Sequence, residues 1–231
     1  MVEIHVKQSD QRQFLYECPA TRSVDIIIRD IVSIHNLQSA IQNLVDHGEQ
    51  LILYGTAKPQ DTETSDADNS KLRDSLYNNP SGRRTGEACD PTGAETLRRT
   101  LTEADAYVSK NQVLHKIPLA LNALKDHIEN IRAAVMICYP MGLPSCDPVQ
   151  QLLDGTFGGE ELFDLETAQL WWAGKELMRD KKLSDRVGKN EKTKIIAKLQ
   201  ARGHGPPTRE PPVDAEILKA MMTRHKKEEE A

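Results

Sequence analysis

The stretch QLWWAGKELMRDKKLSDRVGKNEKTKIIAKLQARG, residues 169–203, decides the fold. Its opening LWW has the composition of a strand, and Gly174 after it permits a tight turn. Leu183 is placed to fill the core beneath a loop, and the Ser-Asp pair after it is typical of a capped short turn. The run IIAKLQARG (195–203) indicates a second strand with a basic end. Strand, turn, loop and strand are therefore predicted in this order.

Two apolar runs precede this stretch at hairpin distance from each other. They are AAVMICYP (133–140) and PVQQLL (148–153), and an acidic helical piece follows at 159–168. Hairpin, helix, strand, turn and strand is the element order of a β-grasp. We therefore predict a β-grasp domain over 133–204.

From Leu170 to Gly203 the sequence resembles the second half of ubiquitin without a gap. The matching residues are Leu170, Ala173, Gly174, Lys175, Leu177, Leu183, Ser184, Asp185, Glu191 and Thr193. The last strand ends in RGHG with more chain after it, instead of a terminal di-glycine. The resemblance implies a ubiquitin-like fold without the conjugation chemistry.

The N-terminal part, 1–55, predicts a hairpin followed by a helix. Apolar residues alternate on both sides of the polar QSDQRQ between residues 2 and 18, which favours two antiparallel strands. Apolar residues then recur every three or four positions over 24–47, as one helix or as two broken near His35. Gly48 is a predicted helix stop, and LILYG (51–55) a predicted short strand. A β-grasp-like fold is one interpretation of this module.

The rest of the chain divides by composition. Residues 56–93 are acidic and rich in Pro, Gly and Asn, which predicts a flexible linker. Residues 94–132 hold two amphipathic patterns, 95–108 and 117–131, and are predicted helical. Residues 205–231 begin GPPTREPP and predict an extended, Pro-rich segment with a frayed helix. The predicted fold class is α+β.

Composition narrows the class of function. The 231 residues carry 30 Lys and Arg against 35 Asp and Glu, a net charge of −5, so we expect no nucleic-acid partner. No apolar run reaches the roughly 20 residues of a membrane span, and the N-terminus has no apolar signal segment, so we expect no membrane partner and an intracellular location. The four cysteines form no C-x-x-C pair, which predicts reduced thiols and no metal.

Enzyme motifs are missing from the sequence. It contains no phosphate-binding Walker loop, no G-x-S-x-G, no H-E-x-x-H and no Gly-rich dinucleotide turn. We therefore predict a protein that is not an enzyme, with no catalytic residue and no cofactor.

Three longer segments resemble the Kurly family of cilia- and flagella-associated proteins. They are AVMICYPMGLPSCDPV (134–149), AQLWWAGKEL (168–177) and 181–211, with looser matches at GRRTGEA (82–88) and 1–15. The resemblance implies a protein of the cytoplasm and the cilium or flagellum, needed for ciliary motility. It also implies a part in assembling outer and inner dynein arms, with axonemal dynein chains and their assembly factors or co-chaperones as partners.

The tryptophan pair is the first candidate protein-binding site. On a strand, Trp171 and Trp172 point to opposite faces, so both cannot be core residues. Exposed tryptophan is enriched at binding hot spots. The alternative is that another element of the same chain covers the outer ring.

A basic stretch is the second candidate. Between Lys175 and Arg209 eleven Lys and Arg face four acids, a local charge of +7 in an acidic chain. The lysines singled out are Lys181, Lys182, Lys189, Lys192 and Lys194. They suit an acidic partner such as a tubulin tail or an acidic chaperone segment. The alternative is a solvated strand face kept soluble by lysines.

Two turns complete the candidates. MGLPSCDP (141–148) predicts an exposed turn of definite shape whose Met141 and Leu143 are recognition side chains or parts of a rigid connection. GRRTG (82–86) pairs two arginines with a threonine and is a weak candidate for receiving phosphate or for being phosphorylated, with a flexible linker as the alternative. Two other functions stay open: a structural axonemal component that binds tubulin tails, and a ubiquitin-pathway adaptor.

Overall fold

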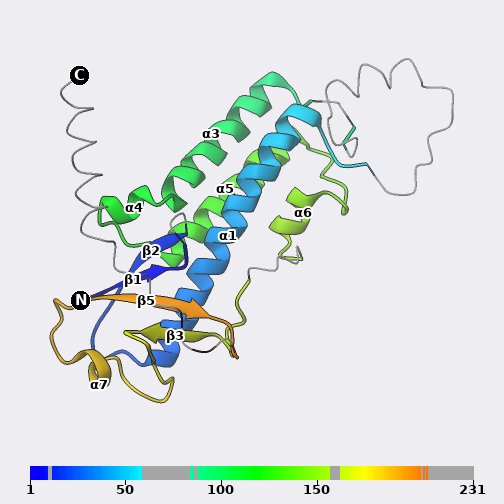
Figure 1. Cartoon of the computed structure of the whole chain (residues 1–231). Helices are drawn as coiled ribbons and strands as arrows, with labels where there is room; N and C mark the ends of the chain where they lie inside the picture. Colours follow the sequence, from blue (N-terminus) through cyan, green and yellow to red (C-terminus); the bar gives the residue numbers. More distant parts are fainter. Residues whose placement is uncertain are drawn as a thin grey trace, which may run out of the picture.

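A computed structural model describes residues 1–9, 12–58, 84–85, 88–156, 162–203, 205 and 207. In it one long helix joins a five-stranded sheet to a group of shorter helices (Figure 1). Most of the predicted linker 56–93 and nearly all of the predicted extension 205–231 lie outside the described residues, so those predictions stay predictions. The α+β class is confirmed.

The N-terminal hairpin is confirmed. β1 (Val2–Lys7) and β2 (Gln13–Cys18) pair antiparallel, with Val2 opposite Cys18. Val2, Ile4 and Val6 are fully buried, while the residues between them are half-exposed. The alternation of apolar and polar residues therefore predicts correctly which face of the hairpin packs against the core.

The other three strands come from the far end of the chain. They are β3 (Gln169–Trp172), β4 (Lys175–Glu176) and β5 (Lys194–Gln200), and the sheet order is β2-β1-β5-β3-β4. β1 and β5 run parallel, and the other neighbours run antiparallel. The predicted strand, turn and strand of 169–203 is confirmed.

α1 (Val24–Tyr54) is one continuous helix, which settles the choice between one helix and two. The helix stop at Gly48 and the strand at 51–55 are wrong, because α1 runs through both. A Cβ atom on Gly48 would lie 2.7 Å from a methyl carbon of Leu101, so this glycine allows close helix packing. Gly55, with φ of +74°, ends the helix instead.

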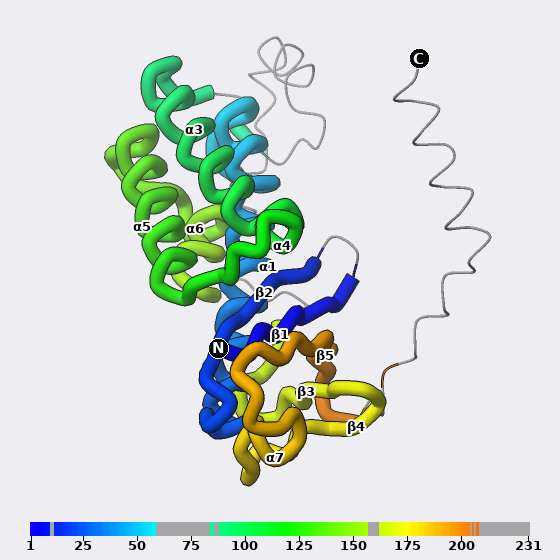
Figure 2. The backbone as a smooth tube through the Cα atoms, turned by 90° about the vertical axis from the view of Figure 1, so that its left-hand side faces the viewer, coloured from blue at the N-terminus to red at the C-terminus, as the bar shows by residue number. Residues whose placement is uncertain are grey.

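Among the described residues between α1 and β3 lie four helices. They are α3 (Pro91–Val108), α4 (Asn111–Leu114), α5 (Leu121–Cys138) and α6 (Pro148–Leu153). Figure 2 shows α3 and α5 beside the second half of α1, while the first half of α1 lies against the sheet. Within the described ranges, no helix is long and apolar enough to cross a membrane.

The predicted strands at 133–140 and 148–153 are wrong. Residues 133–138 are the last turns of α5, where Ala134 and Val135 are buried but Met136 and Ile137 are exposed. That is a helical period, which a short continuous apolar run conceals in the sequence. Residues 148–153 form α6, which begins with Pro148 after the N-cap Asp147.

The sheet therefore takes its first two strands from the N-terminal hairpin and none from 133–153. A β-grasp confined to 133–204 would lack those two strands. The short helix α7 (Ser184–Val187) lies in the loop before β5, and Leu183 just ahead of it is fully buried, as predicted.

The register of β5 can be tested with two neighbouring isoleucines. Ile195 is 3% exposed and Ile196 is 62% exposed. Ile195→Ala should lower the free energy of unfolding by about 2–5 kcal/mol, because it removes core volume. Ile196→Ala should lower it by less than about 1 kcal/mol. Urea unfolding measures both, and equal losses would contradict the register.

Candidate functional site

The sheet separates the two tryptophans. Trp172 lies opposite Ala197 and packs, half-buried, against the core. Trp171 lies on the other face, opposite Lys198 on β5 and Glu176 on β4. Trp171 is partly exposed, although its Nε1 atom is covered and has no hydrogen-bond partner among the described residues.

We call the face that carries Trp171 the outer face. Its described members on β1, β3 and β5 include Glu3, His5, Trp171, Lys194, Ile196 and Lys198. Ile196 lies beside His5 across the β1–β5 pairing and is a large exposed apolar side chain. Sequence reasoning missed Ile196, although the inward alternation of Ile195, Ala197 and Leu199 already places it outward. The outer face can offer a partner apolar anchors with cations beside them.

Of the five candidate lysines, Lys194 lies on a strand of the outer face with Trp171, and the other four lie in loops. Lys181 and Lys182 are exposed, in a loop whose backbone contacts the start of α1. Lys189 and Lys192 are exposed in the loop between α7 and β5. Lys194 begins β5 and forms an ion pair with Glu3 at 2.9 Å, so a carboxylate already compensates its charge.

The turn with Met141 and Leu143 lies elsewhere. Tyr139 Oη donates a hydrogen bond to the backbone oxygen of Leu51 at 3.2 Å, which places this turn at the C-terminal end of α1, away from the sheet (Figure 1). Met141 is fully exposed, whereas Leu143 is half-buried against the core. The structure therefore does not bring these two residues to the outer face.

The GRRTG motif holds a structural arginine. Arg84 is buried, and its guanidinium donates hydrogen bonds to the backbone oxygen of Gly55 at 2.7 Å and to Asp147 at 3.3 Å. Asp147 is fully buried and also accepts from the backbone N–H of Ala57 and Val149. The expectation that this motif receives phosphate is wrong for Arg84, because the side chain is enclosed by its own chain.

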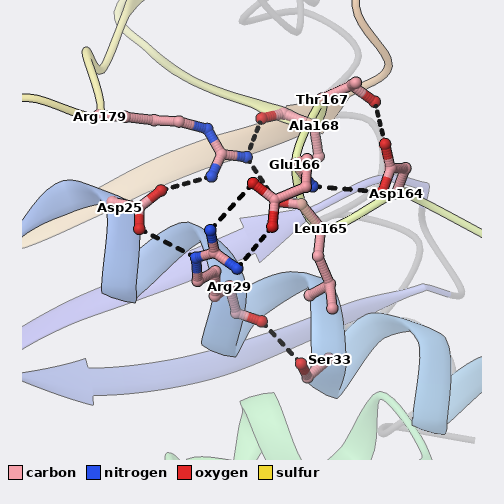
Figure 3. Close-up of polar contacts among 9 residues, drawn as sticks. All are labelled: Asp25, Arg29, Ser33, Asp164, Leu165, Glu166, Thr167, Ala168 and Arg179. Atoms are coloured by element: carbon pink, nitrogen blue, oxygen red, sulfur yellow. Dashed lines mark hydrogen bonds and ion pairs between the residues drawn. The ribbon is translucent and has the colours of Figure 1, made fainter.

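A second polar cluster ties the start of α1 to the chain that returns to the sheet (Figure 3). Arg179 bonds Asp25 at 2.6 Å, and Arg29 bonds the other oxygen of Asp25 at 2.9 Å. Arg29 also pairs with Glu166 at 2.8 Å. Hydrogen bonds from Arg179 and then Arg29 lower the pKa of Asp25. The cluster is partly exposed, and its ion pairs hold the returning chain against the start of α1.

The described part of the chain was compared with what a metal site or a reactive thiol requires. No group of three or more His, Cys, Asp or Glu there is placed to hold a metal ion. All four cysteines are free, as predicted. Burial raises the pKa of Cys138 to about 12, so that thiol stays protonated at neutral pH.

The Arg84–Asp147 pair should be a large contributor to stability. Arg84→Met leaves a carboxylate buried without its cation and should lower the free energy of unfolding by about 3–5 kcal/mol. Arg98→Met removes an exposed arginine from α3 and should cost less than about 1 kcal/mol. Similar losses in the two variants, measured by urea unfolding, would contradict a structural role for Arg84.

The Asp25 cluster makes a prediction about pH. Arg179→Gln should raise the pKa of Asp25 towards its ordinary value, because the strongest hydrogen bond to the carboxylate is lost. In the unaltered protein, the lowered folded pKa stabilises the fold above the unfolded pKa, and this contribution is lost as the pH falls through the folded pKa. Carboxyl-detected NMR titration measures the shift; an unchanged pKa would rule out the bond in solution.

Comparison with known proteins gives one consistent match. The family model described as cilia- and flagella-associated protein 298 matches residues 168–231. The human protein of that name is 39% identical over 232 residues, which cover 91% of this chain and 80% of the human one. The zebrafish protein is 38% identical, covering 92% and 81%, and the Drosophila protein 29% identical, covering 100% and 87%. No solved structure matches the chain.

These matches confirm the resemblance that the three segments indicated, and they extend it over nearly the whole chain. The chain belongs to the cilia- and flagella-associated protein 298 family.

Proposed function

We propose that this protein is a non-enzymatic cytoplasmic factor for axonemal dynein-arm assembly and for the motility of cilia or flagella. Family membership supports a cilium-related role. The observation that carries the proposal further is the outer face, a sheet surface with a half-exposed Trp171 and an exposed Ile196. Such a surface suits contact with another protein, since buried aromatic and aliphatic anchors supply most of the binding energy at interfaces.

We propose that a partner binds to the outer face. The loop between α7 and β5, which carries Lys189 and Lys192 and which we call the lysine loop, attracts the partner electrostatically. Trp171 and Ile196 provide the apolar contact. Lys189 and Lys192 are exposed cations that attract an acidic partner and speed its approach. Lys194 contributes less, because Glu3 already neutralises it. The proposed partners are axonemal dynein chains and their assembly factors or co-chaperones.

We also propose that the sheet and α1 form a ubiquitin-like β-grasp, with the helices α3 to α6 inserted between α1 and β3. The sheet order β2-β1-β5-β3-β4, with β1 parallel to β5, supports this assignment. The residues that resemble ubiquitin then occupy the second half of the same sheet. The inserted helices α3 to α6 separate the β1–β2–α1 half of this fold from the β3–β4–β5 half in the sequence.

Capture from ciliated-cell cytosol tests the outer face. Trp171→Ala and Ile196→Ala should each reduce recovery of axonemal dynein heavy chains, measured by immunoblot, by about tenfold or more, because each removes an apolar anchor. Ile26→Ala is the matched control, since Ile26 is also exposed but lies on α1. Trp172 is left in place because it packs against the core. Undiminished recovery with both outer-face variants would contradict the proposed surface.

The electrostatic part has its own test. A Lys189→Glu, Lys192→Glu double variant should weaken capture at low salt and much less at high salt, because screening removes exposed charge effects. A Lys125→Glu variant alters charge on the exposed side of α5 and should leave capture unchanged. If both variants weakened capture equally, the effect would come from the net charge of the protein and not from these two lysines.

The alternative functions predict different behaviour. A structural axonemal component should co-sediment with microtubules in a salt-sensitive way and lose this on removal of the tubulin tails, whereas an assembly factor should stay in the supernatant. A ubiquitin-pathway adaptor should bind ubiquitin receptors through the outer face. Strong co-sedimentation without dynein capture would favour the structural alternative over our proposal.

A further inference from the structure

Two thiols meet where α3 begins and α5 ends. Cys89 lies two residues before Pro91, the first residue of α3, and Cys138 is the last residue of α5. Their side chains form a hydrogen bond with each other, although the two residues are 49 positions apart in the sequence. Neither belongs to the outer face or to the lysine loop. The fold therefore brings two distant cysteines into contact.

The backbones around the two thiols are also closely packed. A Cβ atom on Gly93, in the first turn of α3, would lie 3.2 Å from the Sγ atom of Cys138 and 3.3 Å from its Cα atom. The N-cap Asp90 accepts a hydrogen bond from the backbone N–H of Thr92 at 3.1 Å, which fixes the chain directly after Cys89. A disulfide forms only between residues whose backbones lie close together. The packing of these two helix ends meets that condition.

Tyr139 is a second neighbour of Cys89. Its side chain forms a hydrogen bond with Cys89, and its hydroxyl donates to the backbone oxygen of Leu51 on α1 at 3.2 Å. The two thiols therefore lie where the C-terminal end of α1, the start of α3 and the end of α5 come together. A covalent bond between them would fasten helices to one another.

The two thiols differ in how readily an oxidant reacts with them. Cys138 packs against the core, and burial raises its pKa to about 12, so it stays protonated at neutral pH. Cys89 is half-buried and lies in the irregular segment ahead of α3. Oxidants react with thiolates that solvent can reach. Cys89 is therefore the thiol that an oxidant attacks first, and Cys138 is placed to react with the product.

We propose that Cys89 and Cys138 are a reversible oxidation site, at which a peroxide converts the two thiols to a disulfide. The sulfur of Cys89 attacks one oxygen of hydrogen peroxide, the O–O bond breaks, and a sulfenic acid and one water are formed. The sulfur of Cys138 then attacks the sulfur of Cys89, the S–O bond breaks, and the hydroxide leaves as water with the proton of Cys138. Two electrons pass from the thiols to the peroxide, and a dithiol reductant reverses the reaction. The site does not depend on the proposed role in dynein-arm assembly.

The disulfide would close a loop that contains α3, α4 and α5. A cross-link restricts the unfolded chain more than the folded one, and this effect grows with the length of the loop. Oxidation should therefore stabilise the helices against unfolding. Disulfides in reducing compartments are usually transient, so the oxidised form should report exposure to peroxide and disappear when reductant returns.

The test uses the full chain, first reduced and then exposed to hydrogen peroxide. Tandem mass spectrometry of a tryptic digest should find the peptide of Cys89 joined to the peptide of Cys138, and dithiothreitol should separate them. The Tm of the oxidised protein should lie about 5 °C or more above the Tm of the reduced protein, because the closed loop is long.

Three serine variants locate the bond. Cys89→Ser and Cys138→Ser should each lose both the cross-link and the rise in Tm. Cys146→Ser should keep both, because this exposed cysteine lies on the same tryptic peptide as Cys138 but directs its thiol to the backbone oxygen of Lys58. The Tm of each variant in the reduced state shows whether it is folded.

Two outcomes would overturn the proposal. Oxidation of both thiols to sulfinic acids without a joined peptide would show that they do not meet in solution. A cross-link from Cys89 to Cys146, or between two copies of the chain, would assign the oxidation to chance encounters of accessible thiols. Because the joined peptides are identified in the unaltered protein, the test decides even if a serine variant fails to fold.

Discussion

Four residue pairs between β1 and β5 hold the two ends of this chain together, and most of the structure follows from them. A lone two-stranded hairpin is marginal in water, so β1 and β2 need β5 beside them. The same pairing sets His5 next to Ile196 and so creates the outer face from strands far apart in the sequence. It also puts Ile4 and Ile195 on the common core side. A change that weakened this pairing would therefore damage the core and the candidate surface together.

The helices α3, α5 and α6 pack along α1, and polar contacts near both ends of α1 hold neighbouring segments against it. With 31 residues, α1 is roughly 46 Å long, enough to reach from the sheet to the far end of the helices. Near its C-terminal end, the buried Arg84 and Asp147 join the chain after α1 to the start of α6. Near its N-terminal end, Arg29 and Asp25 hold the returning segment through Glu166 and Arg179. Further along α1, the Asn36 side chain bonds the backbone of Phe163 and continues this attachment.

Local patterns in the sequence predicted the elements that depend on local forces. Alternation found β1 and β2, composition and a short apolar run found β3 and β5, and the spacing of apolar residues found α1 and most of α3 and α5. The failures have physical causes. The apolar run at 133–140 fits a buried strand as well as a helix, and Gly48 looks like a helix stop until Leu101 is seen against it.

Some features of the candidate sites could be predicted from local sequence patterns, and others depend on contacts between distant residues. Strand geometry alone predicted that Trp171 and Trp172 lie on opposite faces but not which of them is outward. The alternation of Ile195, Ala197 and Leu199 could have placed Ile196 outward. Partners such as Arg84 and Asp147 are 63 residues apart, and a single sequence carries no signal that they meet. The edge-to-face contact of His35 with Phe163 is likewise a property of packing, since the two rings come from segments far apart in the sequence.

The same pairing has a consequence for biosynthesis. Glu3 and its partner Lys194 are 191 residues apart, and a ribosome adding about 5–20 residues per second needs roughly 10–40 s to travel that distance. Throughout this interval the nascent hairpin carries an unfilled strand edge next to its apolar face, a surface that other chains can extend. A message truncated just before β5 would lose only about the last sixth of the chain but would leave that edge open permanently, so the truncated product would be prone to aggregate as well as lacking the outer face.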